Sequence, residues 1–119
     1  MQQRKQIPAA NPALLNSEIT QVHVGSRTYI KPSEIVMISA EISYSYIYLR
    51  DGRKIIVSTN IQKLQERLLG VGSMIRVHRS HIINLDYLKD FDKDIAAMQN
   101  ELYCPISRRK RINLENALN

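Results

Sequence analysis

Residues 35–40 read Ile-Val-Met-Ile-Ser-Ala, a run that is apolar at nearly every position. A strand with one face in water alternates apolar and polar side chains, whereas a short continuous run is typical of a strand that is buried on both faces. The run therefore predicts a strand with protein packed against each of its two faces.

Alternating runs precede this stretch. Residues 19–24 and 27–30 form two strand-like runs around Gly25-Ser26, which predicts a β-hairpin. Residues 31–34 interrupt the strand pattern, and Pro32 near the start of this segment favours a single helical turn.

A second hairpin follows the apolar run. Residues 46–49 and 54–57 are strand-like, and Asp51-Gly52 lies between them. This dipeptide favours a type I′ turn, which needs positive φ at both central residues. We therefore expect the two segments to pair as antiparallel neighbours.

The remaining sequence predicts two helices and four strands. Between residues 61 and 68, apolar residues recur at helical spacing, with Thr59 or Asn60 as the N-cap and Gly70 as the end. A short strand is expected at residues 74–77. A three-strand meander is expected at residues 88–93, 95–99 and 102–106, followed by a last helix that Ser107 caps and that carries Leu114, Ala117 and Leu118 on one face.

Length and composition indicate one domain. The chain has 119 residues, of which 44% are hydrophobic and 24% are charged, and these values are ordinary for a packed globular protein. Residues 1–16, with Pro8 and Pro12, predict a flexible N-terminal tail, and residues 17–119 form the expected domain. The expected fold class is mainly β, mostly antiparallel, with two short helices.

The composition also excludes several classes of protein. Cys104 is the single cysteine, so the chain has no intramolecular disulfide and no multi-cysteine zinc site, and it fits a reducing cytoplasm. No apolar run approaches the roughly 20 residues needed to cross a bilayer. The first residues lack the hydrophobic segment of a signal peptide. We therefore expect a cytoplasmic protein without membrane contact.

Positive charge is concentrated in two places. The chain has 17 Lys and Arg against 11 Asp and Glu, a net charge of +6, which makes a polyanion the expected partner. The first concentration is residues 76–79. Apolar neighbours anchor these residues, and with Ser80 they form a rigid corner between a strand and a loop. Such a corner suits bidentate contact between Arg and guanine. The alternative is that Arg76 and Arg79 pair with carboxylates while His78 caps a turn.

The second concentration is residues 108–111, four consecutive basic residues after Ser107. We expect Ser107 to cap a helix whose first turn holds all four. Positive charge is unfavourable there because the helix dipole places partial positive charge at the N-terminus. Free N–H groups together with Arg make a phosphate site. Polyanion binding is therefore favoured over the alternative of a solvated basic surface.

A third motif is Ser-Tyr-Ser-Tyr at residues 43–46, between two predicted strands. Tyrosines can stack on bases or sugars, and serine hydroxyls can reach phosphates. The alternative is that Tyr46 and Tyr48 simply line one face of a sheet.

Catalytic and metal-binding patterns are missing from the sequence. His78 and His81 lie three residues apart, without a third ligand at a spacing that zinc sites use. Cys104 lies among apolar residues, which predicts a buried, inert thiol. With four glycines, the chain has no glycine-rich phosphate loop. We predict no enzyme activity, no cofactor and no metal.

The order of these motifs resembles the LytTR family of bacterial DNA-binding domains. The resemblance extends over about residues 19–118 and is carried by residues 35–41, 46–53, the helix with Leu64 and Leu68, residues 76–84 and residues 105–109. It implies an elongated domain of several antiparallel sheets with little helix. Family members bind duplex DNA through loops that enter successive major grooves and bend the DNA.

The resemblance also implies DNA contacts in three loops. By position, base reading falls to Arg79 and Arg108, with Tyr44 as a third reader. Phosphate positioning falls to the polar and basic residues around them, namely Ser43, Ser45, His78, Ser80, Ser107, Arg109 and Lys110. Relatives often carry a small residue near the position of Ile42, so the first loop is expected to differ in shape here.

We therefore predict a bacterial, cytoplasmic transcription regulator that binds double-stranded DNA sequence-specifically. By family analogy, two copies would bind direct repeats and dimerise on DNA. Because the chain has no receiver or membrane segment, we expect a separate sensor or regulatory protein to control it. Two alternatives stay open, namely a protein-interaction module that modulates another regulator, and a binder of RNA or single strands through the tyrosines.

Overall fold

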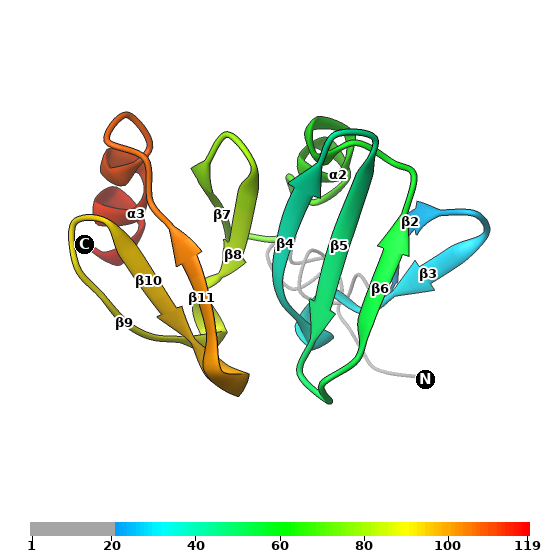
Figure 1. Cartoon of the computed structure of the whole chain (residues 1–119), viewed down its shortest axis with the longest axis horizontal. Helices are drawn as coiled ribbons and strands as arrows, with labels where there is room; N and C mark the ends of the chain where they lie inside the picture. The colour runs from blue at the N-terminus through cyan, green and yellow to red at the C-terminus, as the bar shows by residue number, and fades with distance from the viewer. Residues whose placement is uncertain (1–20) are drawn as a thin grey trace, which may run out of the picture.

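The computed structural model describes residues 21–119, and their elements are drawn in Figure 1. The predicted tail at residues 1–16 and its boundary with the domain lie outside the described residues. In chain order the elements are β2 (Val22–Gly25), β3 (Thr28–Ile30), a 3-10 turn (Pro32–Glu34), β4 (Ile35–Glu41), β5 (Tyr44–Leu49), β6 (Lys54–Val57), α2 (Ile61–Arg67), β7 (Met74–His78), β8 (His81–Asn84), a 3-10 turn (Leu85–Tyr87), β9 (Leu88–Phe91), β10 (Ile95–Met98), a 3-10 turn (Gln99–Glu101), β11 (Leu102–Pro105) and α3 (Arg111–Leu118).

The largest sheet has five strands in the order β6-β5-β4-β8-β7, with every neighbouring pair antiparallel. β4 lies in the middle, and its residues contribute to two separate hydrophobic clusters. Ile35 and Ile38 join one cluster, whereas Val36 and Met37 join the other. The pairing of β4 with β5 shifts register between Ile35 and Met37, which lets two consecutive residues pack in the same cluster. The prediction of a strand buried on both faces is confirmed.

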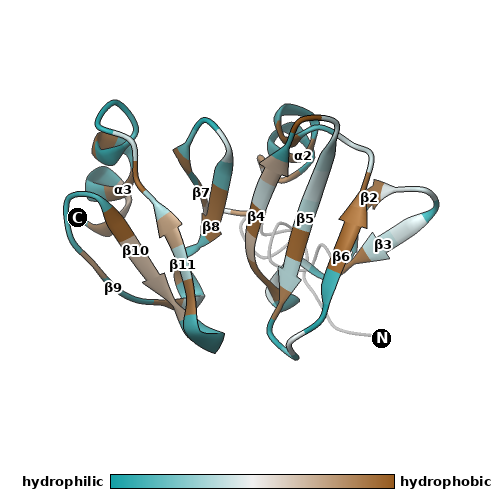
Figure 2. Cartoon of the chain, viewed as in Figure 1, coloured by the Kyte–Doolittle hydropathy of each residue, from teal (hydrophilic) through white to brown (hydrophobic). Residues whose placement is uncertain are grey.

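Two further layers cover the faces of this sheet. The β2–β3 hairpin and α2 contribute to the cluster that contains Ile35. The three-stranded sheet β11-β10-β9 and α3 contribute to the cluster that contains Val36. In Figure 2 the hydrophobic colour appears on parts of β4, β6, β8 and β10. The molecule measures 46 × 36 × 24 Å, and the predicted fold class, an elongated and mainly β domain with two short helices, is confirmed.

The turn between β5 and β6 differs from the prediction. Only Gly52 has positive φ, at 96°, whereas Asp51 does not, so the predicted type I′ turn is wrong. The N–H of Leu49 donates to the carbonyl of Arg53 at 2.9 Å, and this pair encloses a three-residue loop. A three-residue hairpin loop is typically a type I turn followed by one residue in the left-handed conformation, and glycine adopts that conformation without strain.

The other predicted strands and α2 are present within a few residues of their expected bounds, and Asn60 is the N-cap of α2. One strand, β8, was not predicted. The last helix also differs from the prediction. Of the three apolar residues expected on its one face, only Leu114 is buried, whereas Ala117 and Leu118 are exposed. In the part of the chain that the structure describes, neither α2 nor α3 is long and apolar enough to cross a membrane.

Asn84 is a fully buried polar residue at the end of β8, with 1% of its surface exposed. Its Nδ2 donates to the carbonyl of Ile35 at 2.9 Å and to that of Pro32 at 3.5 Å. Its Oδ1 accepts from the N–H of Asp86 at 3.0 Å. One side chain therefore joins the end of β8 to the start of β4 and to the following turn.

We expect Asn84→Ala to lower the free energy of unfolding by about 1–3 kcal/mol, because the change leaves buried backbone groups without partners. Urea unfolding followed by circular dichroism measures the loss. Asn116→Ala on the exposed side of α3 is the matched control and should stay within about 0.5 kcal/mol of the parent. Equal unfolding midpoints for the two variants would contradict this structural role for Asn84.

Candidate nucleic-acid interface

Three connections lie along one edge of the molecule, at the top of the view in Figure 1. We name them loop 1 (residues 41–44, between β4 and β5), loop 2 (residues 78–81, between β7 and β8) and loop 3 (residues 106–110, between β11 and α3). The N–H of Ala40 donates to the carbonyl of Ser80 at 2.8 Å, and the N–H of Ser107 donates to the carbonyl of Val77 at 2.9 Å. Backbone hydrogen bonds thus connect the base of loop 1 to loop 2, and loop 3 to β7.

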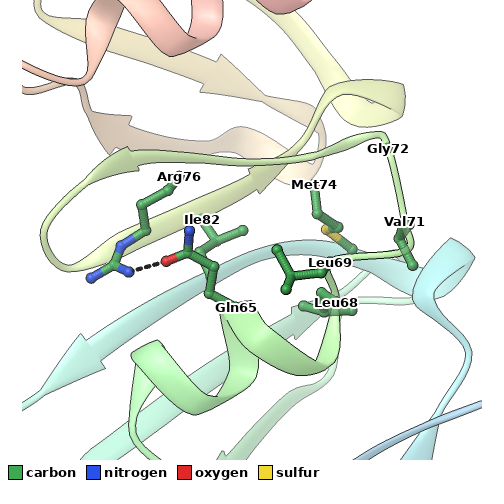
Figure 3. Close-up of a pocket in the computed structure, with 8 residues that line it drawn as sticks. All are labelled: Gln65, Leu68, Leu69, Val71, Gly72, Met74, Arg76 and Ile82. Atoms are coloured by element: carbon green, nitrogen blue, oxygen red, sulfur yellow. Dashed lines mark hydrogen bonds between the residues drawn. The ribbon is translucent and has the colours of Figure 1, made fainter.

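Loop 2 is supported from behind by Arg76. The Nε of Arg76 donates to the carbonyl of His78 at 2.9 Å, and its terminal nitrogens donate to the carbonyl of Arg79 and to the side chain of Gln65 on α2 (Figure 3). Burial lowers the pKa of Arg76 from its usual value. The predicted alternative in which Arg76 pairs with a carboxylate is not observed among residues 21–119.

Arg76 therefore holds the backbone of loop 2 in place, whereas Arg79 projects into solvent. The sequence identified Arg76 as part of a rigid corner but gave it no separate role. Two of its four acceptors are backbone carbonyls, which carry no signal in the sequence, and the other two are the side chains of Gln62 and Gln65 on α2.

His78 caps the turn of loop 2, as one of the predicted alternatives states. The N–H of Ser80 donates to Nδ1 of His78 at 3.0 Å, and the ring meets that of His81 edge-on with centroids 5.2 Å apart. Burial and the charges of Arg79 and Arg76 lower the pKa of His78. Burial, with His78 nearby, lowers the pKa of His81 to about 4. Both rings are therefore neutral at pH 7 and add no positive charge to the loop.

In loop 3, the hydroxyl oxygen of Ser107 accepts from the N–H of Lys110 at 3.0 Å and caps the turn of residues 108–110. The N-cap of α3 is Lys110, so the prediction that Ser107 caps the last helix is wrong. α3 begins only at Arg111, so the prediction that all four basic residues occupy its first turn is wrong. Arg108, Arg109 and Lys110 form a separate turn before the helix. Arg111 instead donates to the carbonyl of Lys93 at 3.1 Å, at the turn between β9 and β10.

The cations of loops 2 and 3 have no acidic partners among residues 21–119. Arg79, Arg108 and Arg109 are exposed and Lys110 is partly exposed, and none of them forms an ion pair in this part of the chain. The two ion pairs within residues 21–119 lie elsewhere: Arg53 contacts Asp51 at 2.8 Å on the opposite edge of the sheet, and Arg111 contacts Glu115 at 3.9 Å along α3. Four positive charges therefore face solvent along one edge, where an anion can reach them.

Loop 1 differs in chemistry from the other two. Ser43 and Tyr44 are exposed, and Tyr44 is accessible over 53% of its surface. Ser45 is fully buried, and its hydroxyl donates to the carbonyl of Thr59 at 2.6 Å. The assignment of Ser45 to a phosphate contact is therefore wrong, because β5 alternates and turns Ser45 into the core.

Tyr46 and Tyr48 line one half-buried face of the sheet, as the simpler of their predicted roles states. The ammonium of Lys54 lies over both rings, 4.9 Å from the centroid of Tyr46 and 5.9 Å from that of Tyr48. This cation occupies the position that a stacked base would need on either ring. The face is therefore poorly suited to binding single strands.

Groups for catalysis or metal binding do not gather at this edge. Cys104 is buried, as predicted, and burial raises the pKa of its thiol to about 12, so it is not a nucleophile at neutral pH. Within residues 21–119, no three His, Cys, Asp or Glu side chains are placed so that they could hold a metal ion.

A shallow cavity lies behind loop 2, between α2 and the β7–β8 hairpin (Figure 3). Leu68, Leu69 and Met74 line its apolar side, and Arg76 with Gln65 forms its polar end. Its volume of about 260 Å³ is below the roughly 300–1,000 Å³ of typical small-molecule sites. We interpret it as a packing gap between the two elements that support loop 2.

Comparison with known proteins agrees with this architecture. The chain is similar in fold to the LytTr DNA-binding domain of a methyl-accepting/DNA response regulator from Bacillus cereus, with a TM-score of 0.64 and 22% identity over 83% of this chain and 94% of the other. The comparison with curated proteins found no match. The sequence profile of the LytTr DNA-binding domain matches residues 25–119, which is most of the chain. The chain therefore belongs to the LytTR family of DNA-binding domains.

Proposed function

We propose that this domain binds duplex DNA sequence-specifically by placing loops 1, 2 and 3 in successive major grooves, and that it acts as a cytoplasmic transcription regulator. The observation that carries the proposal is the edge itself. Three loops lie side by side there, and two of them carry cations without acidic partners in the described part of the chain (Figure 1). Duplex DNA offers the matching line of phosphates.

Base reading is assigned to Arg79 and Arg108, with Tyr44 as a third reader. Both arginines are exposed, and both lie on loops whose backbones are fixed by hydrogen bonds. Bidentate contact with guanine needs this fixed presentation, because two donors must meet two acceptors at once. Tyr44 is the first residue of β5 and is exposed, as a third reader requires.

Phosphate positioning is assigned to the remaining polar groups of the edge. Arg109 and Lys110 supply charge, and neutral contacts come from hydroxyl and imidazole groups that flank the readers. The neutral contacts are Ser43, His78, Ser80 and Ser107, whose exposed or partly exposed side chains support this role. Such contacts fix the register of the domain on DNA without specifying sequence.

The family analogy further suggests two copies bound to direct repeats, dimerisation on DNA, and control by a separate sensor or regulatory protein. No step of the proposal needs a cofactor, a metal or a catalytic residue. A protein-interaction module is the main alternative. Selection of bound sequences from a random duplex library separates the two, because the module would enrich no duplex even at low salt.

We expect Arg79→Ala to weaken binding to the selected duplex by about 1–3 kcal/mol and to flatten the preference at one base position, because a bidentate base contact is lost. Fluorescence anisotropy with the selected duplex and its single-base variants measures both effects. Arg53→Ala is the matched control, since Arg53 is exposed at the opposite edge of the sheet. This substitution should leave DNA binding unchanged. Uniform weakening over all base variants would show that Arg79 does not read sequence.

We expect Lys110→Ala to weaken all duplexes by about the same factor, because it removes a phosphate contact. The slope of log affinity against log salt should become shallower by about 1, as one fewer counterion is released. Titrations at several salt concentrations measure the slope. Lys31→Ala, an exposed site at the far end of β4, should keep the parent slope. The assignment fails if Lys110→Ala changes base preference while the salt slope stays constant.

A further inference from the structure

Ile42 lies at the tip of loop 1, and its side chain is fully exposed, with a relative exposure of 107%. Single exposed apolar residues are common on protein surfaces, so exposure by itself indicates nothing. The position is what matters. Ile42 occupies the two-residue turn of the β4–β5 hairpin, on the same edge as Arg79 and Arg108, and Figure 2 shows a hydrophobic colour at this tip.

The composition of loop 1 indicates which part of DNA it can approach. Loops 2 and 3 carry Arg and Lys, whereas loop 1 contains no basic residue and one carboxylate, that of Glu41. A loop with this composition gains no ion pair with the phosphate backbone, and its hydroxyl groups can make only neutral contacts there. Its apolar tip can gain a favourable contact only at the base edges, which the loop reaches by passing beyond the backbone into the groove.

An isoleucine side chain can make one favourable contact there. It cannot take part in the hydrogen-bond pattern of the bases, but the major groove also displays the C5-methyl group of thymine, which apolar side chains contact. Ile42 would bury its apolar surface against that methyl group.

The tip is also held in a fixed position. The pairing of Glu41 with Tyr44 closes the hairpin, and the N–H of Ala40 donates to the carbonyl of Ser80 at its base. On the other strand, the buried hydroxyl of Ser45 is bonded to Thr59. Ile42 itself is β-branched, which restricts its χ1 angle. Little conformational entropy is therefore lost when the tip is placed against a base.

We propose that Ile42 reads a thymine methyl group in the major groove that loop 1 enters, and so determines specificity at that base pair. The inference rests on the proposed function, since it needs loop 1 to enter duplex DNA. The arginine readers recognise hydrogen-bond acceptors on the bases. Ile42 would add a reader that recognises an apolar group.

Removal of one methyl group from the DNA tests the proposal. The probe is the duplex selected by the parent protein, with each thymine replaced in turn by deoxyuridine, which keeps the base pairing and lacks only the methyl group. At one or two positions, the parent should bind about fourfold more weakly, the factor that corresponds to one buried methyl group. Ile42→Ala should bind the unmodified duplex more weakly than the parent does, by the same factor. Its affinity should not change further when deoxyuridine replaces thymine at those positions.

Ile56→Ala is the matched control, because Ile56 is also an exposed isoleucine, with 56% of its surface accessible, but lies within β6, where it pairs with Tyr46, and belongs to none of the three loops. It should respond to deoxyuridine as the parent does. Thermal unfolding of Ile42→Ala should equal that of the parent, since the side chain makes no buried contact. Its effect on DNA binding is then not an effect on folding.

Three results would overturn the inference while the proposed function stands. In the first, the parent binds its duplex with the same affinity whichever thymine is replaced by deoxyuridine. In the second, each replacement weakens binding of the parent and of Ile42→Ala by the same factor. Alternatively, Ile42→Ala would weaken binding and reduce DNA bending without any response to deoxyuridine, which is the behaviour of an apolar wedge between base steps. Absence of binding to any duplex at low salt would instead contradict the proposed function itself.

Discussion

Burial of β4 on both faces is the constraint on which the rest of the structure depends. Ile35 and Ile38 need one apolar layer, and Val36 and Met37 need another. At roughly 1.5–3 kcal/mol for each large apolar side chain that is fully buried, these four residues contribute on the order of 6–12 kcal/mol, which is comparable with the whole stability of a domain. The β2–β3 hairpin with α2 and the three-stranded sheet with α3 are therefore both required, because removal of either layer exposes half of β4.

The same arrangement brings the three loops to one edge. β4 runs antiparallel to both β5 and β8, so the end of β4 meets the start of β8, where Ala40 donates its N–H to the carbonyl of Ser80. On the other face, the chain leaves β11 and passes β7 at the start of loop 3, where the N–H of Ser107 donates to the carbonyl of Val77. Each loop thus begins or ends in a strand that is fixed by the core. Base readers need positions defined to within about half an ångström, and only such anchored loops supply them.

The sequence predicted those features that depend on local patterns. The apolar run of β4, the alternation of β2 and β3 and the cap of α2 are local, and the structure contains all three. β8 has only four residues with polar ones at both ends, so no periodicity reveals it. Ser45 shares a face with Ile47, and strict alternation along β5 could have shown its burial. The role of Arg76 could not be predicted, because it depends on backbone carbonyls brought close by the fold.

In the proposed complex with DNA, two kinds of recognition are divided between the loops of the edge. Arg108, Arg109 and Lys110 repel one another beside the start of α3, and within residues 21–119 no carboxylate pairs with them. This repulsion destabilises the free protein, and in the proposed complex the DNA phosphates would offset it. Affinity from these loops therefore falls as salt rises. A contact between Ile42 and a methyl group involves no charge, so discrimination by loop 1 persists at salt concentrations that weaken the complex. Affinity and part of the specificity then depend on different loops and respond differently to salt.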